Sequence, residues 1–122
     1  MAYKSKVLLL DDDETMVGLL TTLLEIEGYE VSILKETYNI MDFIRLESPE
    51  IVFLDVHIKY SNGTEFSGFD ILEAIREDKR IQSTKVILSS GMDVSSHAKD
   101  VGADGFLMKP FAPDDLIKMM RF

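Results

Sequence analysis

The sequence contains no cysteine, and it has only three prolines and two histidines. Without cysteine, neither a disulfide framework nor a thiolate zinc site is possible, and a reducing cytoplasmic location is expected. No apolar run approaches the length of a membrane span, and the first residues do not resemble a secretory signal. Basic residues are also few, because 13 Lys and Arg stand against 22 Asp and Glu, for a formal net charge of −9. This excess of negative charge argues against nucleic acid or an anionic membrane as a direct partner and favours basic proteins or metal cations.

Short apolar runs alternate with segments in which apolar residues have helical spacing. A chain of 122 residues is expected to fold as one domain spanning residues 1–122. The runs predicted as strands are Val7–Leu10, Tyr29–Leu34, Ile51–Leu54, Lys85–Leu88 and Phe106–Met108. The segments predicted as helices are Met16–Ile26, Ile40–Ile44, Phe69–Asp78, Val94–Val101 and the stretch from Pro113 onward. Five such repeats predict an α/β fold with a parallel sheet, right-handed crossovers and helices on both faces.

Polar residues with complementary chemistry follow four of these strands. The fully apolar run Ile51–Leu54 predicts a central strand, and it delivers Asp55 to the carboxyl edge of the sheet, where α/β proteins build their sites. Asp11–Asp12, Ser90 and Lys109 end three other strands at the same edge. Converging carboxylates imply a hard divalent ion, with Mg²⁺ favoured when few protein oxygens are supplied. With a lysine and a hydroxyl, they suit phosphoryl transfer to a carboxylate nucleophile, Asp55.

Four motifs in this order resemble the receiver domains of two-component response regulators. The motifs are Val7–Glu14, Ile51–Asp55, Val86–Gly91 and Gly102–Phe111. The resemblance spans nearly the whole chain and implies a flavodoxin-like (βα)5 doubly wound parallel sheet of strand order 2-1-3-4-5. It also implies a phosphorylatable signalling switch that catalyses its own phosphorylation and dephosphorylation but turns over no metabolite.

The resemblance assigns the phosphorylation and metal sites to particular residues. Asp55 would accept phosphate from a histidine kinase or a phosphotransfer protein. Mg²⁺ would be held by Asp11, Asp12 and Asp55, together with the main-chain carbonyl of His57. Neither the His57 nor the His97 imidazole belongs to a metal-ligand spacing, so each is expected to be an ordinary surface or core histidine.

The resemblance also assigns the switch residues. Ser90 would donate its hydroxyl to the phosphoryl oxygens, and Lys109 would pair with the Asp55 carboxylate or phosphate. The peptide bond between Lys109 and Pro110 is expected to be cis. Phe106 matches an aromatic switch position, but an ordinary core aromatic is an equally good interpretation.

Two segments depart from the family's usual spacing. From Asp55 to the helix that begins near Phe69 there are about five extra residues, and Lys59 stands where a proline is common. The enlarged segment His57–Ser67 is expected to be a polar loop with a turn at Asn62-Gly63. It is interpreted either as a mobile flap that tunes the lifetime of the phosphoryl group or as a harmless surface insertion.

The other departure lies between Ser90 and Lys109, where the chain is about three residues shorter than usual. The deletion is expected in the fourth helix or in the loop that enters it. That helix belongs to the family's usual signalling face. The mode of dimerisation and the output of the family are therefore not carried over to this chain.

Two other functions compete with the switch. An aspartyl phosphatase of the haloacid dehalogenase type also uses Mg²⁺, but it places Asp-x-Asp after its first strand, whereas here Asp55-Val56-His57 follows the third. A flavin carrier would need a phosphate loop after the first strand, where Asp11–Asp13 would repel the phosphate. The switch is therefore the preferred hypothesis.

Overall fold

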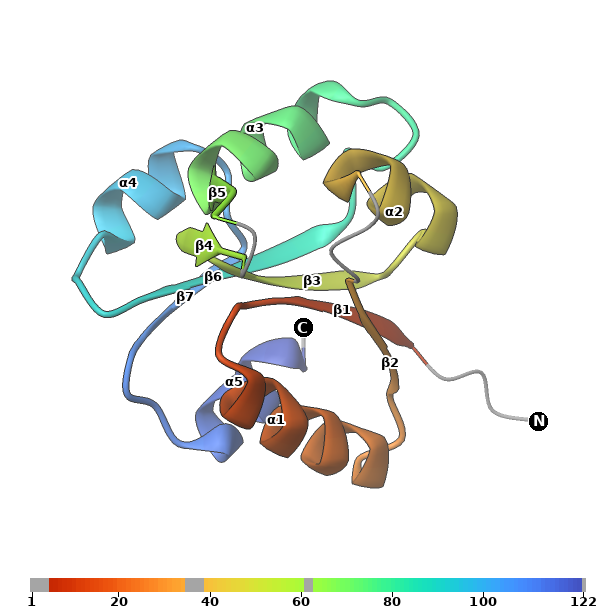
Figure 1. Ribbon diagram of the computed structural model, residues 1–122, viewed down its shortest axis with the longest axis vertical. Helices are drawn as coiled ribbons and strands as arrows, with labels where there is room; N and C mark the ends of the chain where they lie inside the picture. The colour runs from red at the N-terminus through yellow and green to blue at the C-terminus, as the bar shows by residue number, and fades with distance from the viewer. Residues whose placement is uncertain (1–4, 35–38, 61–62, 122) are drawn as a thin grey trace.

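The computed structural model describes residues 5–34, 39–60 and 63–121, which form a five-stranded parallel sheet covered by helices on both faces (Figure 1). The sheet order is β2-β1-β3-β6-β7. Its strands are β1 (Lys6–Leu10), β2 (Glu30–Ile33), β3 (Ile51–Asp55), β6 (Lys85–Ser90) and β7 (Gly105–Met108). With β6 and β7 as the fourth and fifth strands, this is the predicted flavodoxin-like order 2-1-3-4-5, and every pair in the sheet is parallel.

The helices divide between the two faces of the sheet. Helices α1 and α5 cover one face, and α2, α3 and α4 cover the other (Figure 1). Their bounds are α1 Glu14–Ile26, α2 Ile40–Glu47, α3 Gly68–Glu77, α4 Ser95–Asp100 and α5 Pro113–Met120. None of the helices in the described residues is both long enough and apolar enough to cross a membrane.

The position of β3 in the middle of the sheet explains why its sequence is apolar without alternation. All five of its residues are buried, and the four apolar ones contribute to two separate cores. Val52 and Leu54 pack under α2, α3 and α4. Ile51 and Phe53 pack under α1 and α5. A strand covered on both faces has no solvent side, so polar residues appear only where the strand ends, at Asp55.

The start of α1 separates the acidic residues after β1 into two groups. Asp13 is the N-cap, and its Oδ1 accepts the Met16 N–H at 3.1 Å. Glu14 lies in the first turn, where a negative charge favours the positive end of the helix dipole. Capping therefore uses Asp13 and Glu14, and Asp11 and Asp12 remain for another role.

The segment predicted as a polar loop between β3 and α3 is a β-hairpin, so the loop prediction was wrong. Strands β4 (His57–Lys59) and β5 (Glu65–Ser67) pair antiparallel. Both have a polar–apolar–polar pattern, and the central residue of β4, Ile58, is fully buried against the core under α2 and α3. The predicted Asn62-Gly63 turn lies partly outside the described residues, while Gly63 has the positive φ of 87° that such a turn requires.

Helix α4 is short, as the reduced spacing between Ser90 and Lys109 suggested. It has six residues, Ser95–Asp100, against the predicted Val94–Val101. Gly102 follows with a positive φ of 94°, which is the conformation expected of a glycine after a helix.

Candidate functional site

Three carboxylates meet at the carboxyl edge of the sheet. Asp11 and Asp12 follow β1, and Asp55 is the last residue of the neighbouring strand β3. One oxygen from each side chain lies within 4.8 Å of the others. The register explains why they meet, because Leu10 pairs with Leu54 and an aspartate follows each of these two residues in the sequence. The structure thus brings together the three carboxylates that the sequence predicted as metal ligands.

Lys109 reaches this cluster from the end of β7, the strand at one edge of the sheet. Its Nζ donates to Asp11 Oδ2 at 2.9 Å and to Asp55 Oδ2 at 3.2 Å. The lysine follows β7, which is separated from β3 by β6, so the side chain crosses the end of one strand. The cis peptide bond predicted between Lys109 and Pro110 is confirmed.

Burial and neighbouring charges shift the pKa values of Asp11 and Lys109. Burial raises the pKa of Asp11, whose side chain is fully buried, and its bonds to the Asp13 N–H and to Lys109 oppose that shift only in part. Burial also lowers the pKa of Lys109, but the hydrogen bond and the charges of Asp11 and Asp55 outweigh it, so the pKa is raised. Lys109 therefore stays protonated and partly neutralises carboxylates that would otherwise repel one another.

Two serines end β6, and they have different surroundings. Ser90 lies beside Lys109, whose N–H donates to the Ser90 carbonyl at 2.8 Å. The Ser90 Oγ accepts the Met92 N–H at 3.1 Å, so the hydroxyl is held within its own turn. Ser89 pairs with Asp55 in the β3–β6 register, and it is fully buried. In the described part of the chain its Oγ has no hydrogen-bond partner.

The remaining predicted residues lie around this edge. The His57 imidazole is exposed, 3.5 Å from Glu65 Oε2, and only the main chain of His57 lies at the cluster, donating its N–H to Asp55 Oδ1 at 3.4 Å. Phe106 is half-buried and packs against the core under α2, α3 and α4. The His97 ring makes an edge contact with Phe69, with ring centroids 4.3 Å apart.

One contact at the site was missed by sequence reasoning. The Lys59 main-chain N–H donates to Asp12 Oδ2 at 2.7 Å, which links the hairpin to the acidic cluster. The residue type does not reveal such a donor, because every residue except proline carries a main-chain N–H. The alternation of His57-Ile58-Lys59 and Glu65-Phe66-Ser67 around a turn signal was the available evidence for a hairpin.

Two hollows flank α1 beside the cluster. The larger, of about 690 Å³, lies between α1, the end of β2 and the hairpin. The described residues that line it are Asp11, Asp12, Glu14, Val17, Gly18, Ile33, Leu34, Lys59, Tyr60 and Gly63. The smaller, of about 290 Å³, lies between α1 and the segment that connects β7 to α5. Its lining residues are Asp13, Met16, Leu19, Leu20, Lys109, Pro110, Phe111 and Pro113.

The acidic cluster has the donor set of a hard-cation site. Carboxylate oxygens are the ligands preferred by Mg²⁺ and Ca²⁺, and three of them converge here. The burial of Asp11 adds an observation in the same direction, because a buried carboxylate needs a positive partner. Lys109 supplies one positive charge against three carboxylates, which leaves a net negative site that a divalent cation fits.

The fold and this edge together define a CheY-like signalling module, and comparison with known proteins agrees. The family model described as the response regulator receiver domain matches residues 7–121. The chain therefore belongs to the response regulator receiver domain family, and it is a signalling module rather than a classical enzyme.

Individual relatives are distant in sequence and close in fold. The DNA-binding response regulator MtrA of Mycobacterium tuberculosis is 25% identical over 118 residues, which cover 97% of this chain and 50% of MtrA. The chain thus spans about half the length of this relative. The chemotaxis response regulator CheY4 of Vibrio cholerae superposes with a TM-score of 0.81 at 24% identity, covering 98% of each chain.

A second similar structure contains bound ligands. It is a response regulator protein from Burkholderia pseudomallei with a phosphorylated aspartic acid, a calcium ion and citrate. Its TM-score is 0.79 at 21% identity, with 97% of this chain and 67% of that chain covered. At this identity the likeness shows a shared fold.

Proposed function

We propose that this domain is a phosphorylation switch in which Asp55 accepts a phosphoryl group from a histidine kinase or a phosphotransfer protein, with Mg²⁺ as cofactor. The observation that carries the proposal is the position of Asp55. Its carboxylate ends the central strand, lies within 4.8 Å of the Asp11 and Asp12 carboxylates and accepts a hydrogen bond from Lys109. Receiver domains partner with histidine kinases, which fits a phosphohistidine donor.

The transfer needs a nucleophile, charge neutralisation and a positioned donor. An Asp55 carboxylate oxygen attacks phosphorus and forms the acyl phosphate, while the donor's P–N bond breaks and its electron pair returns to the imidazole nitrogen. Asp11, Asp12, Asp55 and the His57 main-chain carbonyl would hold Mg²⁺, which supplies neutralisation of the phosphoryl charge when bound. Lys109 holds a positive charge beside the same oxygens, and Ser90 would donate its hydroxyl to the transferred group.

The smaller hollow beside Lys109 supports approach of the donor protein from the α1 side. It joins apolar residues of α1 to the segment that carries Lys109 and Pro110. Leu19 on its border is 53% exposed, so it offers apolar surface to a protein that docks there. A donor that covers this surface would bring its phosphohistidine to the edge where Asp55 lies.

We also infer that residues 1–122 act as one receiver module.

Intact-mass analysis after incubation with acetyl phosphate and Mg²⁺ tests the proposal. The wild-type protein should gain one phosphoryl group, and Asp55→Asn should gain none, because the amide is not a nucleophile under these conditions. The matched control is Asp13→Asn, since Asp13 is exposed and serves as a helix cap. Asp13→Asn should gain one group as the wild type does. An Asp55→Asn protein that still gains a phosphoryl group would overturn the assignment.

A further inference from the structure

The β4–β5 hairpin has a free edge that faces the acidic cluster. In an antiparallel pair, successive main-chain N–H groups of one strand point alternately toward the partner strand and away from it. The Tyr60 N–H donates to the Thr64 carbonyl at 2.9 Å, and the Gly68 N–H donates to the Val56 carbonyl at 2.7 Å. These bonds set the phase of the ladder, so the N–H groups of His57 and Lys59 point away from β5.

Both outward N–H groups donate to carboxylates of the cluster. The His57 N–H reaches Asp55 Oδ1 at 3.4 Å, which is a long contact. The Lys59 N–H reaches Asp12 Oδ2 at 2.7 Å, at the short end of the range for N–H donors. A donor bonded to a charged acceptor makes a stronger bond than a neutral pair does. Asp12 is itself exposed, so this bond supplies a restraint that packing does not.

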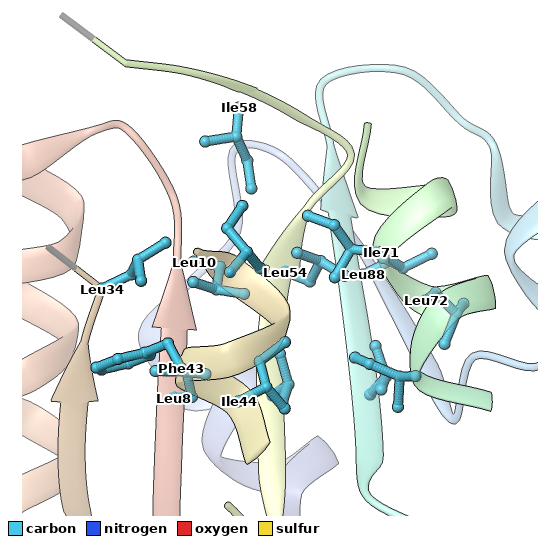
Figure 2. Packing of buried hydrophobic residues seen from close by; sticks show 14 of the residues in the cluster. Leu8, Leu10, Leu34, Phe43, Ile44, Leu54, Ile58, Ile71, Leu72 and Leu88 are labelled. Atoms are coloured by element: carbon cyan, nitrogen blue, oxygen red, sulfur yellow. The ribbon is translucent and has the colours of Figure 1, made fainter. Parts of the chain in front are cut away.

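Packing holds the hairpin, and with it the donor, in place. Ile58 is fully buried and lies over Leu10 and Leu54 in the core (Figure 2). The rings of Tyr60 and Phe66 meet edge to face, with centroids 5.6 Å apart. The Lys59 N–H is thus presented by a fixed element, and it does not depend on the Lys59 side chain, which is 61% exposed.

We propose that the hairpin positions Asp12 for cation binding through the main-chain N–H of Lys59. The proposal rests on the metal site of the proposed function and adds to it an orienting group that this enlarged segment supplies. The bond restrains Asp12 in the orientation in which its oxygen lies near those of Asp11 and Asp55. Hydrogen bonds that orient ligating carboxylates commonly change metal affinity by about 10-fold to 100-fold when removed.

Lys59→Pro and Lys59→Ala separate the main chain from the side chain. Proline removes the N–H, and because that N–H faces away from β5, no bond of the hairpin ladder is lost. Alanine removes the amine, which lies 3.8 Å from Glu65, and keeps the N–H. Calorimetric titration with Mg²⁺ alone should show affinity about tenfold weaker for Lys59→Pro, with Lys59→Ala close to the wild type. Equal affinity of the two variants would overturn the proposal.

Amide hydrogen exchange provides a readout that needs no metal. In the metal-free wild type, the Lys59 amide should exchange slowly, and Asp12→Ala should accelerate it at least several-fold while the Tyr60 amide keeps its protection. Fast exchange of the Lys59 amide in the wild type would show that the bond to Asp12 does not persist. If Lys59→Pro fails to fold, Ile58→Ala replaces it, and loosening the hairpin should then weaken Mg²⁺ binding several-fold; unchanged affinity would contradict the role.

Different results would exclude the metal site and the role of the hairpin. If the wild type binds no Mg²⁺, the metal site of the proposed function is wrong. If the wild type binds Mg²⁺, Asp12→Ala loses it and Lys59→Pro binds as the wild type does, then only the role of the hairpin is wrong.

Discussion

Lys109 is the residue whose two roles are hardest to separate, because it neutralises the cluster and would also respond to phosphorylation. Its ammonium contacts Asp11 and Asp55, where a divalent cation would bring its own charge. A positive charge already at the site disfavours a second one, so removing it should favour metal binding. The lysine is therefore expected to serve the switch more than the affinity for metal.

Lys109→Ala should bind Mg²⁺ at least as tightly as the wild type, and up to several-fold more tightly, since a competing cation is gone. It should nevertheless lose the conformational response to phosphorylation, because the group that distinguishes the two states is missing. Calorimetry measures the affinity, and amide NMR spectra with acetyl phosphate measure the response. Lys118→Ala, an exposed position on α5, is the control. A Lys109→Ala protein that responds as the wild type does would make the lysine purely structural.

Asp78 links stability to pH away from the functional edge. The side chain and the N–H of Arg80 lower its pKa from 3.8 to about 2, and Arg45 adds to this across the gap between α2 and α3. A lowered pKa means that the folded state prefers the carboxylate. The resulting stabilisation is present above the unfolded value of 3.8 and is lost as the pH falls toward about 2.

Asp78→Asn should therefore be less stable than the wild type at neutral pH. The difference should narrow as the pH falls from 3.8 toward about 2, because the wild-type carboxylate is then protonated too. Urea denaturation at a series of pH values measures the difference. A constant difference across that interval would show that Asp78 acts through shape and not through charge.

At the residue scale, the sequence predicts side chains better than main-chain groups. Asp11, Asp12, Asp55 and Lys109 were predicted to meet because each follows an apolar run in a parallel sheet, and they do meet. The N–H of Lys59 could not be predicted, since every residue except proline carries one. Its use depends on the register of a hairpin that had been predicted as a loop.

At the element scale, two glycines in helices should respond in opposite ways to the same substitution. Gly18 lies within α1, and an added Cβ there meets nothing within 4 Å. Gly68 begins α3 directly after the hairpin, and an added Cβ there would overlap the Asp55 carbonyl oxygen and lie 2.9 Å from Val56 Cα. The hairpin returns so close to β3 that only a hydrogen atom fits.

Gly18→Ala should raise the free energy of unfolding by about 1 kcal/mol, because alanine loses less backbone entropy in a helix. Gly68→Ala should lower it by about 1–3 kcal/mol, since the contact with main-chain atoms forces the backbone apart. Chemical denaturation of both variants measures the two changes. A neutral Gly68→Ala would mean that the hairpin and β3 can separate at little cost.

Elements were predictable where their pattern was long, and less so where it was short. The apolar run of β3 and the amphipathic α1 were located from sequence nearly to the residue. The strands β4 and β5 have three residues each, which is too short for a pattern to stand out from a polar segment. Their pairing depends on burying Ile58, a tertiary contact that local sequence does not contain.

At the scale of the whole molecule, Arg76 of α3 bonds to two segments that lie apart in the sequence, one before β6 and one before β7. Its guanidinium donates to the carbonyls of Gly102, Gln82 and Thr84 and to the Asp104 carboxylate. These groups lie on the approaches to β6 and β7, at the opposite ends of the strands from Ser90 and Lys109. Arg76 therefore holds together the starts of the two strands whose other ends carry Ser90 and Lys109.

The order of the strands in the sheet brings the site residues close together. Neighbouring strands β1 and β3 bring the carboxylates of Asp11 and Asp55 close together, and β6 and β7 carry Ser90 and Lys109 to the same edge. The resemblance predicted this order, and composition alone did not, because many strand orders satisfy the same alternation of strands and helices.

The central claim is that Asp55, a divalent cation and the switch residues act as one unit. Amide NMR spectra of the wild-type protein, recorded before and after addition of acetyl phosphate with Mg²⁺, test it most directly. We expect chemical-shift changes centred on Asp55 that extend to Ser90 and Lys109, that require Mg²⁺ and that are absent in Asp55→Asn. Unchanged spectra, or the same shifts in Asp55→Asn, would contradict it.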